Sequence, residues 1–286
     1  EEKYMTLPNL IGCGAGKSGT TSLYYYLSQH PQIFMAAAKE LHFFSRHYSE
    51  GLSWYESFFN GSENSPVIGE FSTSYMLDKA VPERIASLIP NAKLLFILRN
   101  PIERAYSNYW FSISIGTQDR SQSFSDAIRT KSGFNRYVYS GYYYQHLTRF
   151  IHHLSSSQIY VIITEEFKLD PIRQMSMCYD FLNVDKTFQP NVEQQYNVTL
   201  TTRNYLLGKI FASWVNRKQQ IKPLLKRFPI GLRRNFALLE KRFMNKLMTN
   251  ERPSMSDTDF ALLRDEFSEQ NQKLAEFIGR ELSCWH

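Results

Sequence analysis

A glycine-rich stretch near the start of the chain, IGCGAGKSGTTS from Ile11 to Ser22, has the residue types of a phosphate-binding loop. An ATP-type loop needs a glycine, four spacer residues, then Gly-Lys and Ser or Thr, because that length wraps the backbone amides around two successive phosphates. Gly16, Lys17 and Ser18 supply the end of this pattern, but Ile11 stands where the first glycine is required. We therefore expect a loop that is related to the ATP-type loop without being identical to it.

This loop leads into a predicted helix and could hold a phosphate. Its backbone amides, the helix dipole and the Lys17 ammonium all favour an anion. The residues predicted to bind this group are Gly16, Lys17, Ser18, Gly19, Thr20 and Thr21.

A second group of polar residues follows the apolar run LLFILRN, which we predict to be a strand. A nucleoside triphosphate site would have an acid at the end of such a strand to hold magnesium, but this chain has Arg99. A guanidinium cannot ligate a metal ion, whereas it can bind a phosphate through two parallel hydrogen bonds. Asn100 and Pro101 are typical of a helix cap and first residue, with Ser107 about two turns further on. Arg99 and Ser107 are predicted to bind one anion; the alternative is that Arg99 is a structural ion-pair partner.

Two phosphate sites on neighbouring strands, without a magnesium-binding acid, describe a nucleotide with two separated phosphate groups, as in 3′-phosphoadenosine 5′-phosphosulfate (PAPS). The chain here resembles the sulfotransferase family, whose 5′-phosphosulfate loop has the pattern Lys-Ser/Thr-Gly-Thr-Thr and whose 3′-phosphate motif is an Arg and a Ser spaced as Arg99 and Ser107 are. It is most similar to the branch of heparan sulfate sulfotransferases and their bacterial relatives. The similar segments, which run from Leu10 to Trp285 with little similarity between 200 and 250, are LSQHPQI, KELHFF, GLSWYESFF, LLFILRNPIERAYSNY and EFSEQNQKLAEFIGRELSCW.

The resemblance implies transfer of a sulfonate from PAPS to a hydroxyl or an amine of a carbohydrate or small-molecule acceptor. The nucleotide product would be 3′-phosphoadenosine 5′-phosphate (PAP), and no metal would be required. Such a transfer needs a base for the acceptor proton and a cation at the departing oxygen. The resemblance assigns the base to Glu40 and the cation to Lys17.

Within KELHFF, an extended backbone would put Glu40 and His42 on the same side. His42 would then orient Glu40 or the acceptor, or act as the base itself, as a histidine does in more distant sulfotransferases. Lys39 would help to hold the sulfonate or point to solvent.

Two departures from the heparan-type pattern bear on acceptor and compartment. The segment GEFSTSY has Phe71 where that branch has a lysine that contacts an anionic acceptor. The paired cysteines often found near the family's C-terminus are absent, and the three cysteines present are too scattered for a disulfide framework. The first departure disfavours a glycosaminoglycan-like acceptor. The second favours a bacterial-type, cytoplasmic enzyme; the alternative is the Golgi lumen, if a membrane anchor was removed.

The elements that would position these residues alternate between strands and helices. Short apolar runs predict strands, and the sequence between them is typical of helices. We predict an α/β fold with a P-loop-like, mostly parallel central sheet flanked by helices and a helical C-terminal part. The predicted strands are residues 7–11, 67–69, 93–98 and 159–164, and the predicted helices include 20–29, 203–248 and 257–279, the last capped by Ser256 or Asp257.

The composition is that of a globular protein. The 286 residues are 43% hydrophobic and 15% aromatic, which excludes disorder, and we expect one domain over 1–286. No apolar run approaches the roughly 18–20 residues needed to cross a bilayer. We expect no nucleic-acid partner.

The net charge of +6 comes from one segment. Residues 209–246 hold eleven Lys or Arg against one acid, within the predicted helical segment of about 203–248. We favour a solvated basic face over contact with an anionic partner or membrane surface. The alternatives for the whole chain are a P-loop kinase or ATPase, and a non-catalytic module that binds polyanions through this segment.

Overall fold

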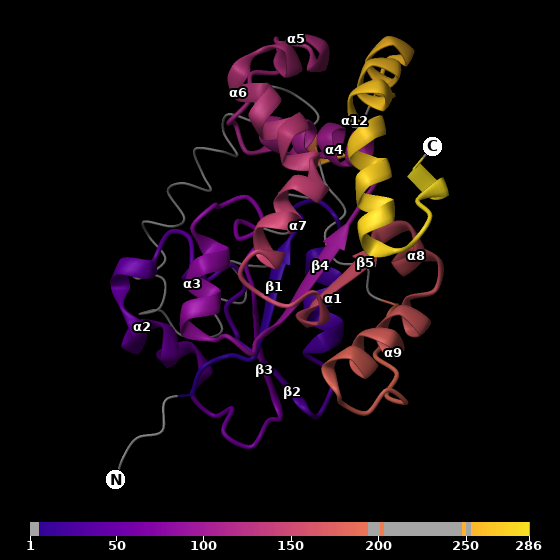
Figure 1. Ribbon diagram of the computed structural model, residues 1–286. Helices are drawn as coiled ribbons and strands as arrows, with labels where there is room; N and C mark the ends of the chain where they lie inside the picture. The colour runs from indigo at the N-terminus through magenta and orange to yellow at the C-terminus, as the bar shows by residue number, and fades with distance from the viewer. Residues whose placement is uncertain (1–5, 194–200, 203–247, 250–252, 286) are drawn as a thin grey trace. The chain divides into compact units, whose positions relative to one another are not determined.

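The computed structural model describes residues 6–193, 201–202, 248–249 and 253–285 (Figure 1). The chain divides into two compact units. The first unit comprises Glu1–Arg104, Ser140–Asn197 and Leu262–His286, and the second comprises Ala105–Tyr139 and Val198–Ala261. The single domain predicted from the sequence stays a prediction.

The first unit is built on a five-stranded sheet in the order β2-β3-β1-β4-β5, in which every strand pair is parallel. This confirms the predicted α/β fold. The strands are β1 Leu10–Gly14, β2 Ile33–Met35, β3 Val67–Phe71, β4 Lys93–Leu98 and β5 Ile159–Ile163.

Two strand predictions need correction. The first strand begins at Leu10, not at Leu7, and continues to Gly14, because its pairing begins at Leu10, which lies opposite Gly69 of β3 and Lys93 of β4. The edge strand β2 was not predicted, since three residues are too few to show an alternating pattern.

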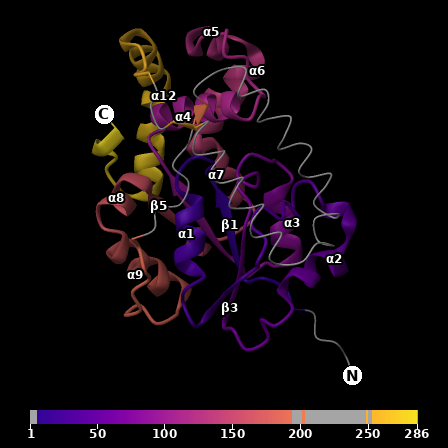
Figure 2. The same cartoon turned by 180° about the vertical axis from the view of Figure 1, so that it is seen from behind.

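Helices cover both faces of this sheet (Figures 1 and 2). Leu95 and Ile97 of β4 pack with α1, α8 and α9, while Leu94 and Phe96 pack with α2, α3, α7 and the C-terminal part of α12. The period of two along β4 therefore divides the core into two layers. The helices of this unit are α1 Thr20–Leu27, α2 Leu52–Glu56, α3 Val81–Leu88, α7 Tyr143–Ile151, α8 Thr164–Leu169 and α9 Pro171–Leu182, with single turns at η1 Tyr48–Glu50, η2 Ser57–Phe59, η5 Ser156–Gln158 and η6 Ser283–Trp285.

The second unit has its own aromatic packing, in which Tyr109 contacts Phe124 and Tyr137. The helices α4 and α12 and the turn η4 each have residues in both units. The elements are α4 Pro101–Ser114, α5 Phe124–Arg129, α6 Lys131–Gly133, the π-helical turn η3 Phe134–Val138, η4 Tyr139–Gly141 and α12 Asp257–Ile278.

The C-terminal predictions are confirmed in part. The helix predicted over 257–279 is α12, and Ser256 caps it, because its Oγ accepts a hydrogen bond from the Asp259 amide at 3.1 Å. No strand was predicted after Asp185, but β6 Thr201–Thr202 and β7 Met248–Thr249 form an antiparallel pair. Two residues per strand are too few for periodicity to reveal. Residues 203–247 of the predicted basic helical segment lie outside the described residues.

Among the described residues, no helix combines the length and the apolar character that crossing a bilayer requires.

The close contact between β1 and β3 generates a stability prediction. A Cβ added to Gly12 would lie 2.1 Å from Cδ2 of Phe71, whose ring is buried and cannot move into solvent. Gly12→Ala should therefore lower the free energy of unfolding by about 1–3 kcal/mol, as overpacked cores do. Urea denaturation measures this change. In Gly12→Ala/Phe71→Leu the loss should be smaller than the sum of the two single losses; strict additivity would contradict the clash.

Candidate active site

The glycine-rich loop connects β1 to α1 at the carboxyl end of the sheet, where open α/β sheets bind ligands. The Ala15 amide donates to the Ile97 carbonyl of β4 at 2.8 Å, which fixes the start of the loop. Lys17 and Gly19 have positive φ values of 72° and 96°, so the chain turns sharply before α1 begins at Thr20. Of the predicted phosphate-binding residues, Gly16, Lys17, Ser18 and Gly19 lie in this loop and Thr20 and Thr21 open the helix.

Ser18 is the part of the loop that best fits an anion. Its side chain is fully buried, yet its Oγ makes no hydrogen bond of ordinary geometry among the described residues. The Tyr143 hydroxyl contacts it, and a phosphate oxygen at the loop would give it a hydrogen-bond partner of ordinary geometry. Burial raises the pKa of Tyr143, and the charge of Arg104 and the Ser18 side chain oppose that rise.

Two buried hydroxyls tie the loop to the end of β4. Thr164 Oγ1 lies 2.7 Å from the Ser18 carbonyl oxygen and 2.8 Å from that of Leu98. The Tyr143 hydroxyl donates to the Arg99 carbonyl at 2.9 Å. The loop and the residue predicted to bind the second phosphate are thus held to the same buried framework.

Arg99 lies directly after β4, as predicted, and its Nη2 pairs with Glu103 at 3.0 Å. This ion pair matches the alternative prediction for Arg99 and leaves its pairing with Ser107 on an anion as a prediction. Asn100 is the predicted cap, since its Oδ1 accepts from the Ile102 amide at 2.9 Å. Ser107 is buried on α4 within the second unit.

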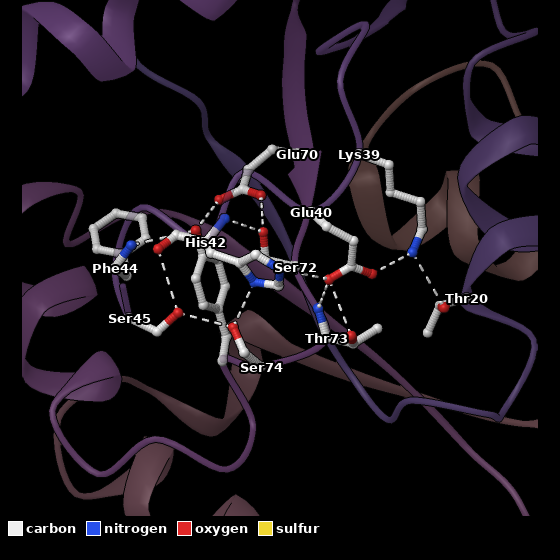
Figure 3. A network of polar contacts seen from close by, with 11 residues as sticks. Thr20, Lys39, Glu40, His42, Phe44, Ser45, Glu70, Ser72, Thr73 and Ser74 are labelled. Atoms are coloured by element: carbon white, nitrogen blue, oxygen red, sulfur yellow. Dashed lines mark hydrogen bonds and ion pairs between the residues drawn. The ribbon is translucent and has the colours of Figure 1, made fainter. Parts of the chain in front are cut away.

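Glu40 and His42 lie together, although the extended backbone predicted for them is wrong. Their φ values are 64° and 55°, in the left-handed region, because the loop turns back on the end of β3. The Glu40 amide donates to the Phe71 carbonyl at 2.8 Å. His42 Nε2 lies 3.6 Å from Glu40 Oε2 (Figure 3).

The Glu40 carboxylate is held from two sides. Oε2 accepts hydrogen bonds from the amide and the hydroxyl of Thr73 at 2.8 and 3.0 Å. Oε1 lies 2.6 Å from Lys39 Nζ, and the same ammonium reaches Thr20 Oγ1 at 3.4 Å (Figure 3). The Lys39 side chain is 18% exposed, so its ammonium faces the site and not solvent. Lys39 therefore links the carboxylate to the first residue of α1.

The surroundings of His42 favour its neutral form. Burial lowers its pKa, with smaller lowering from Arg46, His47 and Lys39, while the Glu40 charge acts in the opposite direction. Its Nδ1 lies 2.7 Å from Ser74 Oγ, which in turn lies 2.8 Å from Ser45 Oγ. These contacts leave Nε2 facing Glu40.

A second carboxylate, Glu70, was not predicted to matter. It lies in β3, is fully buried, and accepts hydrogen bonds from the hydroxyls of Ser72, Tyr55 and Tyr75. Burial raises the pKa of Glu70 to about 7, against the lowering by these three hydrogen bonds; the Glu40 charge adds a small further rise. The signal in the sequence was the run of hydroxyl residues 72–74 directly after a strand.

The described residues contain no group of three or more His, Cys, Asp or Glu side chains that could hold a metal ion. Metal independence itself stays a prediction.

Comparisons with known proteins agree on one family. Residues 7–205 match the family model of the sulfotransferase domain. A membrane-associated sulfotransferase of Dictyostelium discoideum, kil1, is 42% identical over 116 residues, which are 40% of this chain and 25% of that protein. The human bifunctional heparan sulfate N-deacetylase/N-sulfotransferase 2 is 31% identical over 195 residues, which cover 62% of this chain and 22% of that protein. The chain thus spans about a quarter of the length of these relatives.

The fold is also that of a solved sulfotransferase from Alicyclobacillus acidocaldarius. The two structures superpose with a TM-score of 0.71 over 98% of this chain and 99% of the other, at 24% sequence identity.

The raised pKa of Glu70 predicts how stability depends on pH. Since the pKa of Glu70 is about 7 in the folded protein and 4.5 for an unperturbed glutamate, the native state binds this proton more tightly than the unfolded state. The free energy of unfolding should therefore fall as pH rises from about 4.5 to 7, by up to about 3 kcal/mol. The neighbouring Cys13, Tyr55 and Tyr75 have raised pKa values and stay protonated throughout.

Urea denaturation of the wild type and of Glu70→Gln across this range measures the effect. The difference in stability between the two proteins should shift in favour of Glu70→Gln as pH rises. A difference that does not change with pH would contradict the assignment.

Proposed function

The chain belongs to the sulfotransferase family, and we propose that it transfers a sulfonate from PAPS to a hydroxyl or an amine of an acceptor. One observation carries this proposal. The Lys39 ammonium joins the Glu40 carboxylate to Thr20 at the start of the phosphate-loop helix. A candidate base therefore stands beside the predicted site of the phosphosulfate.

The donor would be held by two groups of residues. Gly16, Lys17, Ser18, Gly19, Thr20 and Thr21 would bind the 5′-phosphosulfate, and Arg99 and Ser107 the 3′-phosphate. The buried Ser18 hydroxyl and the positive end of the α1 helix dipole support the first group. The donor supplies the activated sulfonate and leaves as PAP. Lys17 would place positive charge where the departing oxygen gains negative charge.

Glu40 would take the acceptor proton. An ionised carboxylate has about four acceptor positions, and Thr73 and Lys39 use three of those on Glu40. One position is left for an acceptor O–H or N–H. His42 would orient Glu40 or the acceptor through Nε2, and its neutral form keeps it as the alternative base.

The acceptor class is proposed to be a carbohydrate or a small molecule. Two observations concern the acceptor: the similarity to a relative named for heparan sulfate, and the contacts of Phe71. Phe71 is buried against Gly12, and the Lys39 ammonium lies 5.7 Å from its ring centroid. Lys39 would thus present a positive charge to the acceptor close to Phe71, the position at which heparan-type enzymes have a lysine.

A cytoplasmic setting remains part of the proposal. All three cysteines are free thiols, with Cys13 and Cys178 buried and Cys284 exposed. Residues 209–246, for which contact with an anionic or membrane surface is the alternative prediction, lie outside the described residues.

The donor is tested by thermal stabilisation. PAP at 100 times its dissociation constant should stabilise the folded protein by about 2.7 kcal/mol, and the melting temperature should rise accordingly. ATP with magnesium is the comparison ligand. A rise with ATP and none with PAP would replace the sulfotransferase proposal with that of a kinase or ATPase.

The base is tested by Glu40→Gln. This variant should lose about 10²–10⁴-fold in transfer, the usual contribution of a general base, and should still bind PAP. Release of PAP from PAPS is measured with unsulfated glucosamine oligosaccharides and simple alcohols as acceptors. Glu63→Gln, at an exposed carboxylate bonded to the Gly61 amide, is the control and should match the wild type. If Glu40→Gln keeps full activity while His42→Gln loses it, His42 is the base.

A further inference from the structure

The loop that carries Glu40 and His42 adopts a backbone that needs support. Both residues have left-handed φ values, 64° and 55°. Neither is a glycine, and a left-handed backbone is unfavourable for a residue that carries a Cβ. Surrounding contacts must therefore hold the loop in place.

Part of that support comes from two hydroxyl groups. Ser72 Oγ accepts a hydrogen bond from the His42 amide at 2.9 Å (Figure 3), and the Tyr75 hydroxyl accepts one from the Phe44 amide at 3.3 Å. Each hydroxyl has a single hydrogen and can accept from an amide only when that hydrogen points elsewhere.

Both hydroxyls donate their hydrogen bonds to Glu70. Its Oε2 accepts from Ser72 at 2.7 Å, and its Oε1 accepts from Tyr75. When ionised, Glu70 can only accept hydrogen bonds, so it fixes the direction of both hydroxyl hydrogens and turns the hydroxyl lone pairs toward the loop amides. A glutamine here would present N–H groups to one of them and reverse that direction.

From this geometry we propose that Glu70 is a positioning residue, which acts through Ser72 and Tyr75 to hold the loop from Glu40 to Phe44 in the conformation required for transfer. It touches neither donor nor acceptor. The proposal rests on the proposed function for the part that concerns transfer, whereas the part that concerns the loop can be tested without it. Glu70 lies in the core even though burial raises the pKa of its carboxyl group, and a fully hydrogen-bonded buried network is consistent with a positioning role.

A third hydroxyl supplies a matched control. The Tyr55 hydroxyl also donates to Glu70 Oε1, at 3.1 Å, but among the described hydrogen bonds it accepts none from a loop amide. Its ring stacks on Phe43 with centroids 4.0 Å apart, and Tyr55→Phe keeps that ring. Tyr55→Phe, Tyr75→Phe and Ser72→Ala therefore each remove one hydroxyl from Glu70, and only the last two break a bridge to the loop.

The first measurement is hydrogen exchange of the amides by NMR on the full chain. Ser72→Ala should speed exchange of the His42 amide at least tenfold, and Tyr75→Phe should do so for Phe44. Glu70→Gln should speed both. The Glu40 amide, bonded to the Phe71 carbonyl, reports whether the strand end itself is intact. Tyr55→Phe should leave the His42 and Phe44 amides within about twofold of the wild type.

The second measurement is turnover of PAPS with the same oligosaccharide and alcohol acceptors. Ser72→Ala and Tyr75→Phe should lower kcat at least tenfold and leave the KM for PAPS within about threefold. Ser72→Thr, which restores a hydroxyl, should recover most of the loss. Tyr55→Phe should stay within about twofold of the wild type.

Several outcomes would overturn the proposal. Unchanged exchange at His42 and Phe44 in the bridging variants, or losses in Tyr55→Phe equal to theirs, would reduce Glu70 to a general core residue. Should Glu70→Gln not fold, the three hydroxyl variants still decide between these results. Failure of the proposed function is a separate result: PAP would then give no thermal stabilisation and PAPS no turnover, while Ser72→Ala would still speed exchange of the His42 amide.

Discussion

The parallel alignment of β1, β3 and β4 is the constraint on which the candidate site depends. Neighbouring parallel strands end at the same edge of a sheet, so three segments far apart in the sequence meet there. They are the loop after β1, the hydroxyl-rich residues after β3 and Arg99 after β4. Backbone hydrogen bonds from Ala15 to β4 and from Glu40 to the end of β3 then fix two of the loops to the strands. The sheet therefore determines which residues lie near the site, and the loops determine how the side chains are oriented.

The second physical feature is the balance between burial and hydrogen bonding around Glu70. A charged carboxylate in an apolar core loses solvation, and three hydroxyl donors restore only part of it, because the pKa still rises to about 7. An apolar residue here would avoid this cost. It could not, however, orient Ser72 and Tyr75 toward the amides of the neighbouring loop.

Sequence alone predicted the parallel sheet apart from its edge strand β2, and it named residues that the structure brings to one edge of that sheet, for identifiable reasons. The bounds of β4 were predicted residue for residue, since five apolar residues after Lys93 end at an abrupt polar boundary. The cap at Asn100 followed from local chemistry that acts within three residues. The left-handed backbone at Glu40 and His42 could not be predicted, because hydrogen bonds to residues about 30 positions away impose it. Glu70 was missed for the same reason: its function depends on partners that only folding brings near.

The three hydroxyl residues that follow β3 show why local pattern and tertiary context must be combined. In an extended strand, Ser72 and Ser74 would face one side and Thr73 the other. The chain instead turns here, with the Tyr75 amide donating to the Ser72 carbonyl at 3.2 Å. The turn allows Ser72 to reach the His42 amide, Thr73 the Glu40 carboxylate and Ser74 the His42 ring. Three consecutive residues thus orient the His42 amide, the Glu40 carboxylate and the His42 imidazole. A shift of residues 72–74 would therefore move all three groups together.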